Sequence, residues 1–187
     1  MTVLQEFTFE AESILEGAIR NAEDRARRYT LETSKSEHAR QTTTVENRVA
    51  TICANIDWRT RSFKIGQNES GVDVMKRAGS AFSRCAPGVV LLPAGGPLNE
   101  SLCSVRYWRW LGGEDYQLKY SNSADAWTVS DANGTVLAEL KSSISPIFGQ
   151  TSLPLLRISP TVRSEEERLF FLLVLVYSET KRLDRQG

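Results

Sequence analysis

Apolar and polar residues alternate along most of the chain, as they do in β-strands that have one buried face. The clearest stretch covers residues 49–58, where every second residue is apolar: Ala50, Ile52, Ala54, Ile56 and Trp58. Shorter segments rich in β-branched and aromatic residues predict further strands, at 3–9, 29–33, 42–47, 62–65, 102–111, 116–120, 126–130, 135–141 and 153–158. Residues 68–71 predict a turn, and residues 131–134, which end in Asn-Gly, predict a hairpin turn.

A loose segment at residues 78–100 divides these strands into two sets. It holds three of the six prolines and four of the twelve glycines, which is typical of a connection. The pattern therefore predicts one domain over residues 1–187 with a duplicated β architecture, in which half-barrels at 1–77 and 101–160 flank the connection.

The C-terminal segment contains nine consecutive apolar residues, 169–177. Ser164 followed by Glu167 forms a capping box, and Lys181 and Arg182 suit the negative end of a helix, so the segment predicts a helix over 164–182. Nine residues span only ~14 Å, which is too short to cross a membrane. A helix that is apolar on all sides must be enclosed. The sequence thus predicts a mainly β fold, a closed antiparallel barrel of about twelve strands around a central hydrophobic helix.

Composition and charge narrow the range of functions. The 187 residues contain 23 basic and 23 acidic side chains, which removes any global electrostatic argument for a nucleic-acid or anionic-membrane partner. One histidine, His38, and three scattered cysteines cannot form a metal site or a disulfide framework, and we expect no cofactor. The N-terminus has no basic region followed by an apolar stretch, so we expect a cytoplasmic protein.

The whole pattern resembles the tubby C-terminal-like superfamily, which includes the plasma-membrane scramblase and LURP-one-related proteins, and most closely uncharacterised fungal tubby-like proteins. The features that carry this resemblance are residues 29–33, 42–45, 49–52 leading to Trp58, 108–110, 136–138 and 155–158, and the terminal apolar helix with its Lys181-Arg182 tail. The resemblance implies about twelve strands closed around a hydrophobic helix. It also implies phosphoinositide headgroups held by cationic residues on the barrel wall, and it identifies no catalytic group.

Local basic clusters are the candidate headgroup-binding residues: Arg25, Arg27, Arg28, Arg59, Arg61 and Lys64, with a further pair at 76–77. Arginine suits phosphate because its planar fork binds two oxygens, although acidic neighbours make ordinary solvated charge pairs an alternative. Trp108 and Trp110 share one strand face and line either the core or an apolar pocket. The leading hypothesis is a non-enzymatic binding module for a lipid headgroup, another amphiphile or a protein partner, peripheral to membranes and without a membrane span.

A cofactor-independent enzyme acting on an apolar small molecule is the alternative. In this hypothesis the 78–100 segment covers a hydrophobic cleft whose floor is Trp108 or Trp110. Acid–base chemistry would fall to Asp57, Glu114 or Asp115, because desolvation beside a tryptophan raises the pKa of a carboxyl group. His38 lies in a polar stretch without a nucleophile and is expected to be a solvated loop residue.

Overall fold

The computed structural model describes residues 4–37, 39–47, 52–78, 106–142 and 152–186. In this part of the chain, thirteen strands form one antiparallel sheet. The strands are β1 Gln5–Phe9, β2 Gly17–Asn21, β3 Arg27–Ser36, β4 Ala39–Asn47, β5 Cys53–Asp57, β6 Ser62–Ile65, β7 Asn68–Gly71, β8 Lys76–Ala78, β9 Arg106–Arg109, β10 Asp115–Ser121, β11 Ala126–Ser130, β12 Val136–Lys141 and β13 Leu155–Ile158. The prediction of a mainly β, antiparallel fold is confirmed.

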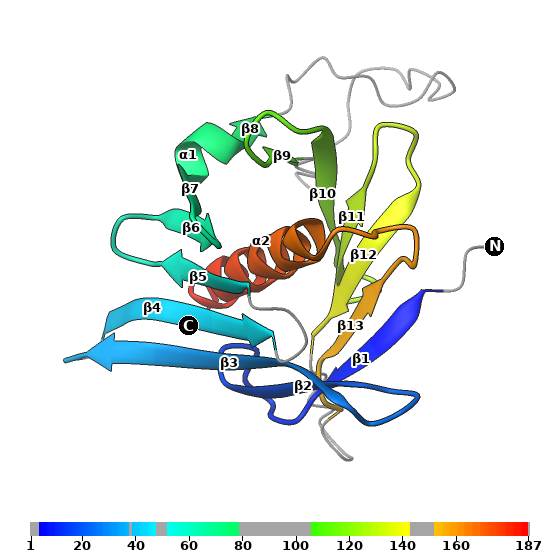
Figure 1. Ribbon diagram of the computed structural model, residues 1–187, viewed down its shortest axis with the longest axis horizontal. Coiled ribbons are helices and arrows are strands. Elements are labelled where there is room, and N and C mark those ends of the chain that lie inside the picture. The colour runs from blue at the N-terminus through cyan, green and yellow to red at the C-terminus, as the bar shows by residue number, and fades with distance from the viewer. Residues whose placement is uncertain (1–3, 38, 48–51, 79–105, 143–151, 187) are drawn as a thin grey trace, which may run out of the picture.

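Two meanders make up the sheet. Strands β1 to β7 pair in chain order, β8 to β13 do the same, and the β1–β13 ladder joins the two sets. The sheet curves around the C-terminal helix, and its two edge strands, β7 and β8, are connected by the short helix α1, Val72–Met75 (Figure 1). No ladder pairs β7 with β8 in the described residues, so closure of the barrel stays a prediction.

The C-terminal helix α2, Glu165–Leu183, lies on the concave side of the sheet (Figure 1). Its N-cap is Ser164, whose hydroxyl accepts a hydrogen bond from the backbone N–H of Glu167 at 3.4 Å. Every residue from 169 to 180 is buried, so the helix fills the space inside the curved sheet. The predicted helix is confirmed to within one residue at each end, because its capping box and charged ends are local signals.

Aromatic packing joins the helix to the wall. Trp108 on β9 stacks on Phe63 of β6 with ring centroids 5.8 Å apart, and Tyr177 of α2 meets both rings edge-on. Ala54 and Ile56, which the alternating pattern assigns to the inner face of β5, are fully buried. Burying such rings removes large apolar areas from water and accounts for much of the stability of the fold.

Three strands differ from the sequence expectation. Residues 68–71 form strand β7 instead of a turn, and β2 and β8 were not expected. Strand β2 has two consecutive buried residues, Ala18 and Ile19, and its pairing with β3 shifts register directly after Ile19. This interrupts the alternation of buried and exposed residues by which a strand is predicted from sequence. Strands β7 and β8 are short and lie at the sheet edges, where pairing with β6 and β9 outweighs weak local propensity.

Candidate functional site

A basic pocket of about 270 Å³ lies beside the last turns of α2. Five of the eight residues that line it are cationic, and none of the eight is acidic. The lining consists of Arg61, Lys76, Arg106, Trp108, Tyr177, Ser178, Lys181 and Arg185. We call this cavity the basic pocket.

Strand pairing directs two of these cations toward the helix. Lys76 of β8 lies opposite Trp108 of β9 in the antiparallel ladder, and residues directly opposite each other share a sheet face. Arg106 is two positions before Trp108 on β9 and therefore shares that face as well. Because Trp108 is only 1% exposed and belongs to the core, Lys76 and Arg106 lie on the inner face of the sheet.

The helix contributes a matching stripe. Tyr177, Lys181 and Arg185 follow one another at intervals of four residues, which places them along one side of α2 and its C-terminal extension. The carboxyl end of a helix carries a partial negative charge, and basic side chains in its last turn offset that charge. The pocket holds five cations, whereas the carboxyl end of a helix carries a negative charge of only about half an elementary charge. The helix end alone therefore does not balance the positive charge of the lining.

Two of the five cations have an acidic partner. Arg61 donates to Asp73 at 3.0 Å, and Lys181 lies 3.8 Å from Asp184. In the part of the chain that the structure describes, no carboxylate lies within ion-pair distance of Lys76, Arg106 or Arg185. Among the described residues, the pocket therefore gathers three cations that have no carboxylate partner.

The pKa values in the pocket reflect this crowding. Burial lowers the pKa of Lys76, and the charges of Arg106, Arg185 and Arg61 lower it further, against a small opposing effect of Asp73. Burial, and then the charge of Arg185, lowers the pKa of Arg106 as well. The protonated forms of both side chains are therefore less stable here than in water. A bound anion would stabilise these protonated forms.

Two buried hydrogen-bond donors in the same lining lack an acceptor. Within the described residues, four buried side-chain polar atoms have no partner, and two of these, Trp108 Nε1 and Ser178 Oγ, belong to residues that line the basic pocket. Trp108 and Ser178 are 1% and 2% exposed. Both atoms are themselves buried, so these two donors stay without an acceptor next to the pocket.

The structure distributes the candidate headgroup residues over several surfaces. Of the six, only Arg61 lines the basic pocket. Arg28 contacts Glu165 at 3.4 Å, and Arg27 lines a different cavity over β2 and β3. Arg59 follows Asp57 in the turn after β5, where its backbone N–H donates to the Asp57 carboxylate, and Lys64 lies on β6.

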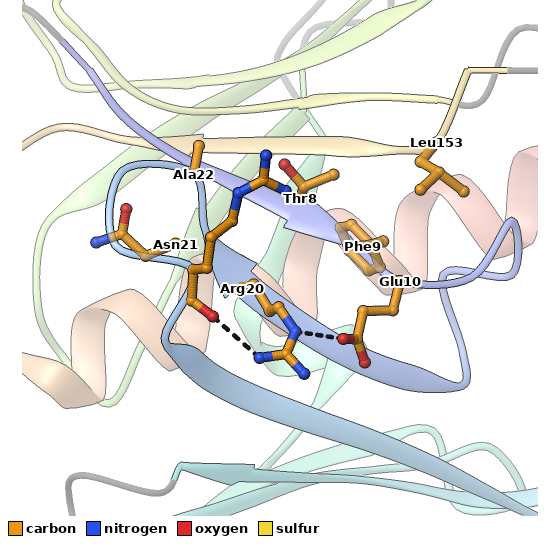
Figure 2. A pocket seen from close by; sticks show the side chains of 8 residues that line it. Thr8, Phe9, Glu10, Arg20, Asn21, Ala22 and Leu153 are labelled. Carbon is orange, nitrogen blue, oxygen red and sulfur yellow. Dashed lines mark hydrogen bonds and ion pairs between the residues drawn. The ribbon is translucent and has the colours of Figure 1, made fainter.

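Arg25 lies at a wider groove of about 740 Å³ along β1 and β2. Figure 2 shows that the Arg20 guanidinium in this groove is already held, by the Glu10 carboxylate and by the backbone carbonyl of Arg25. Phe9 and Leu153 add apolar surface (Figure 2). Because Glu10 compensates Arg20, this groove attracts an anion less strongly than the basic pocket does.

The three carboxylates of the enzyme hypothesis come from two parts of the chain, Asp57 at the end of β5 and the neighbours Glu114 and Asp115 at the start of β10. Asp57 accepts from the backbone N–H groups of Arg59 and Thr60, and these bonds, led by that of Thr60, lower its pKa. Asp115 accepts two bonds from Arg109, at 2.8 and 2.5 Å. Glu114 lines a cavity of about 450 Å³ with Trp110, but its side chain is exposed.

The first turn of α2 forms a separate polar junction with the wall. Glu165 accepts hydrogen bonds from the Tyr29 hydroxyl at 3.0 Å and from the Asn47 amide. Glu166 accepts one from Trp110 Nε1 at 2.7 Å, and Glu167 accepts one from the Tyr116 hydroxyl at 2.6 Å. Burial and the adjacent carboxylates raise the pKa of Tyr29 and of Tyr116. The three carboxylates diverge to different strands, and the described residues contain no group of three or more potential metal ligands.

Sequence reasoning missed three of the five cations of the basic pocket as ligand contacts. Lys76 belongs to the candidate basic pair at 76–77, whereas Lys181 was interpreted only as a helix-end charge and Arg106 and Arg185 were not singled out. One signal was present: Arg106 precedes Trp108 by two positions and so shares its buried face. The expected loop at His38 and the 78–100 segment beyond residue 78 lie outside the described residues.

Comparison with known proteins gives no match: no family model, no curated protein and no solved structure corresponds to this chain. The resemblance to tubby-like proteins therefore stays a prediction. None of the helices in the described residues has the length and apolar character needed to cross a membrane.

Proposed function

We propose that this protein is a non-enzymatic binding module that holds a phosphorylated headgroup, or another compact polyanion, in the basic pocket. The observation that carries the proposal is the cluster of Lys76, Arg106 and Arg185, three cations that have no carboxylate partner within the described residues. A folded protein gains nothing in stability by gathering like charges in a cavity, so binding of an anion is the simplest reason for the arrangement.

Phosphate is the anion that fits this chemistry best. Guanidinium groups bind two phosphate oxygens at once, and the ammonium groups of Lys76 and Lys181 act as point charges. A ligand with several phosphate groups uses more of this lining than a single carboxylate does.

The proposal also includes the features that the tubby-like resemblance implies. In this view α1 completes a closed barrel between β7 and β8, and the protein acts in the cytoplasm at a membrane surface. Residues 169–180 of α2 are buried inside the curved sheet of the described chain, which supports recognition of a headgroup at the end of the helix over insertion of an acyl chain beside it.

Titration at low salt tests the proposal, since screening weakens such contacts as the ionic strength rises. The soluble probe is inositol 1,4,5-trisphosphate. The membrane probe is phosphatidylcholine vesicles with phosphatidylinositol 4,5-bisphosphate, compared with phosphatidylserine vesicles of equal charge. We expect binding to both phosphorylated probes and weaker binding to phosphatidylserine. Binding of the free headgroup without the vesicles would identify a soluble phosphate ligand.

A pair of double variants locates the site. Arg106→Gln with Arg185→Gln removes two charges from the basic pocket, and Arg27→Gln with Arg59→Gln removes the same charge elsewhere. Each lost guanidinium contact should weaken binding about tenfold, so the first variant should lose affinity and the second keep it. The reverse result would assign binding to the clusters predicted from sequence, and no binding by the wild type would refute the proposal.

The enzyme alternative receives less support. Only Glu114 of its three carboxylates lines a cavity, and that carboxylate is exposed, whereas the alternative requires a desolvated one. Asp57 and Asp115 are engaged in a turn and in an ion pair.

A further inference from the structure

Lys76 differs from the three arginines of the pocket because it is a potential nucleophile. A guanidinium stays protonated, whereas an amine that loses its proton can attack a carbonyl group. Lys76 lies on the inner face of β8, opposite Trp108, and its side chain is partly buried. The pocket thus places two amines, those of Lys76 and Lys181, among guanidinium groups. Lys181 lies 3.8 Å from Asp184, whereas Lys76 has no carboxylate within ion-pair distance in the described part of the chain.

The groups that face Lys76 come from four elements and are mostly cationic. They are Arg106 on β9, Arg185 after α2, Arg61 before β6 and Asp73 on α1. Asp73 is the one acidic group among them, and its side chain is 78% exposed and bonded to Arg61. Burial and the neighbouring cations both lower the pKa of Lys76, so more of its amine is neutral near pH 8 than for an exposed lysine.

We propose that Lys76 captures a phosphorylated aldehyde in the basic pocket as an imine. This inference rests on the proposed anion-binding function, because the guanidinium groups of Arg106 and Arg185 hold the phosphate. They thereby keep the carbonyl carbon close to the Lys76 amine.

The chemistry balances without any co-reactant. The lone pair of Lys76 Nζ forms a bond to the carbonyl carbon, and the carbonyl π electrons move to the oxygen, which takes up the proton that the nitrogen releases. The carbinolamine then loses a proton from nitrogen and hydroxide from carbon, which together leave as water. The sum is amine plus aldehyde giving imine plus water, with no change in oxidation state.

Borohydride trapping tests the inference on the full chain. The protein is incubated briefly at pH 7.5 with pyridoxal 5′-phosphate or with pyridoxal, which lacks the phosphate, then reduced and mapped by mass spectrometry. We expect pyridoxal 5′-phosphate to label Lys76 several-fold faster than Lys119, because the lowered pKa leaves more of the Lys76 amine neutral and the guanidinium groups hold the phosphate beside it. Pyridoxal should label Lys76 more slowly, and inositol trisphosphate should protect it.

Lys119 is the internal control because it is exposed and lies on β10, outside the pocket. The labelling rate of Lys76 should reach its plateau at a lower pH than is usual for a lysine, because its pKa is lowered. Lys76→Arg should abolish the pocket-directed label, whereas Lys64→Arg should leave it unchanged. Equal labelling of Lys76 and Lys119, or equal rates with pyridoxal, would overturn the inference.

The two proposals fail in different ways. If wild-type protein binds inositol trisphosphate but Lys76 is not labelled selectively, imine capture is refuted and anion binding stands. If neither wild type nor Lys76→Arg binds the trisphosphate, the proposed function is refuted. In that case a label on Lys76 that phosphate cannot block also refutes imine capture directed by the pocket.

Discussion

Trp127 Nε1 donates a hydrogen bond of 2.9 Å to Glu179 Oε2, which joins strand β11 to the buried face of α2. Glu179 is 1% exposed and also accepts from Ser142 Oγ at 2.5 Å and from the Arg182 guanidinium, twice at 2.7 Å. Both carboxylate oxygens are therefore saturated. This buried carboxylate attaches the end of α2 to the wall of the sheet, as Glu165 to Glu167 attach its beginning.

Removing that carboxylate should strongly destabilise the protein. Glu179→Ala leaves Trp127 and Ser142 without their acceptor and takes the principal acidic partner from Arg182. We expect a loss of about 3–5 kcal/mol in the free energy of unfolding, measured by urea denaturation. Glu46→Ala, an exposed position on β4, is the control and should change little. A loss below about 1 kcal/mol for Glu179→Ala would show that the network is weak.

The same carboxylate should make stability depend on pH in the acid range. Burial alone would raise the pKa of Glu179, but the hydrogen bonds from Arg182, Ser142 and Trp127 and the charge of Arg182 outweigh it and lower the pKa. A lowered folded-state pKa means that the contribution is complete above the unfolded-state pKa, about 4.3, and is lost as pH falls through the folded-state value.

Urea midpoints of wild type and Glu179→Gln, measured from pH 7 to pH 2.5, check this dependence. The gap between the two proteins should be largest at neutral pH and should narrow in acid. A gap that stays constant over the whole range would mean that the ionisation of Glu179 does not contribute.

The sequence predicted those parts of the fold that depend on local signals. The Ser164–Glu167 capping box set the start of α2, and the alternation around Ala54 and Ile56 identified the inner face of β5. Strand β8 could not be found in this way, because three residues do not establish a period and the strand exists through its pairing with β9.

The basic pocket could be predicted only in part. Its cations come from four segments, around residues 61, 76, 106 and 181–185, and they meet only because β8 pairs with β9 beside the end of α2. Residues 25–28 were predicted to bind a headgroup because their basic residues are close together in sequence, but Arg28 forms an ion pair with Glu165. Adjacency in sequence does not report which charges are compensated in the fold.

Leu172→Asp tests whether α2 is enclosed. Leu172 is fully buried in the middle of the helix, so an aspartate there would place a charge, or a costly neutral carboxyl group, in the core. We expect a destabilisation of more than about 5 kcal/mol, comparable with the whole stability of many domains, and therefore no folded protein by circular dichroism. Leu183→Asp, at a position that is 47% exposed on the same helix, should fold normally. A soluble, cooperatively unfolding Leu172→Asp variant would contradict the buried position.

The basic pocket should reduce stability when it is empty. Because Lys76, Arg106 and Arg185 repel one another and burial disfavours their charges, Arg106→Gln should raise the free energy of unfolding by a few tenths to about 1 kcal/mol at low salt. The matched control is Arg109→Gln on the same strand, which removes the ion pair with Asp115 and should not stabilise the protein. The gain from Arg106→Gln should shrink as added salt screens the repulsion.

The same pair of variants should show the opposite order for ligand stabilisation. Inositol trisphosphate at saturating concentration should raise the thermal midpoint of wild type and of Arg109→Gln more than that of Arg106→Gln, because a ligand stabilises only the state that binds it. If Arg106→Gln is instead less stable than wild type without ligand, Arg106 makes favourable contacts in the folded protein. Repulsion among the pocket cations would then not be the dominant effect at Arg106, which would contradict this prediction. If Arg106→Gln is more stable than wild type without ligand and is stabilised less by the ligand, the charge of Arg106 lowers stability and serves binding.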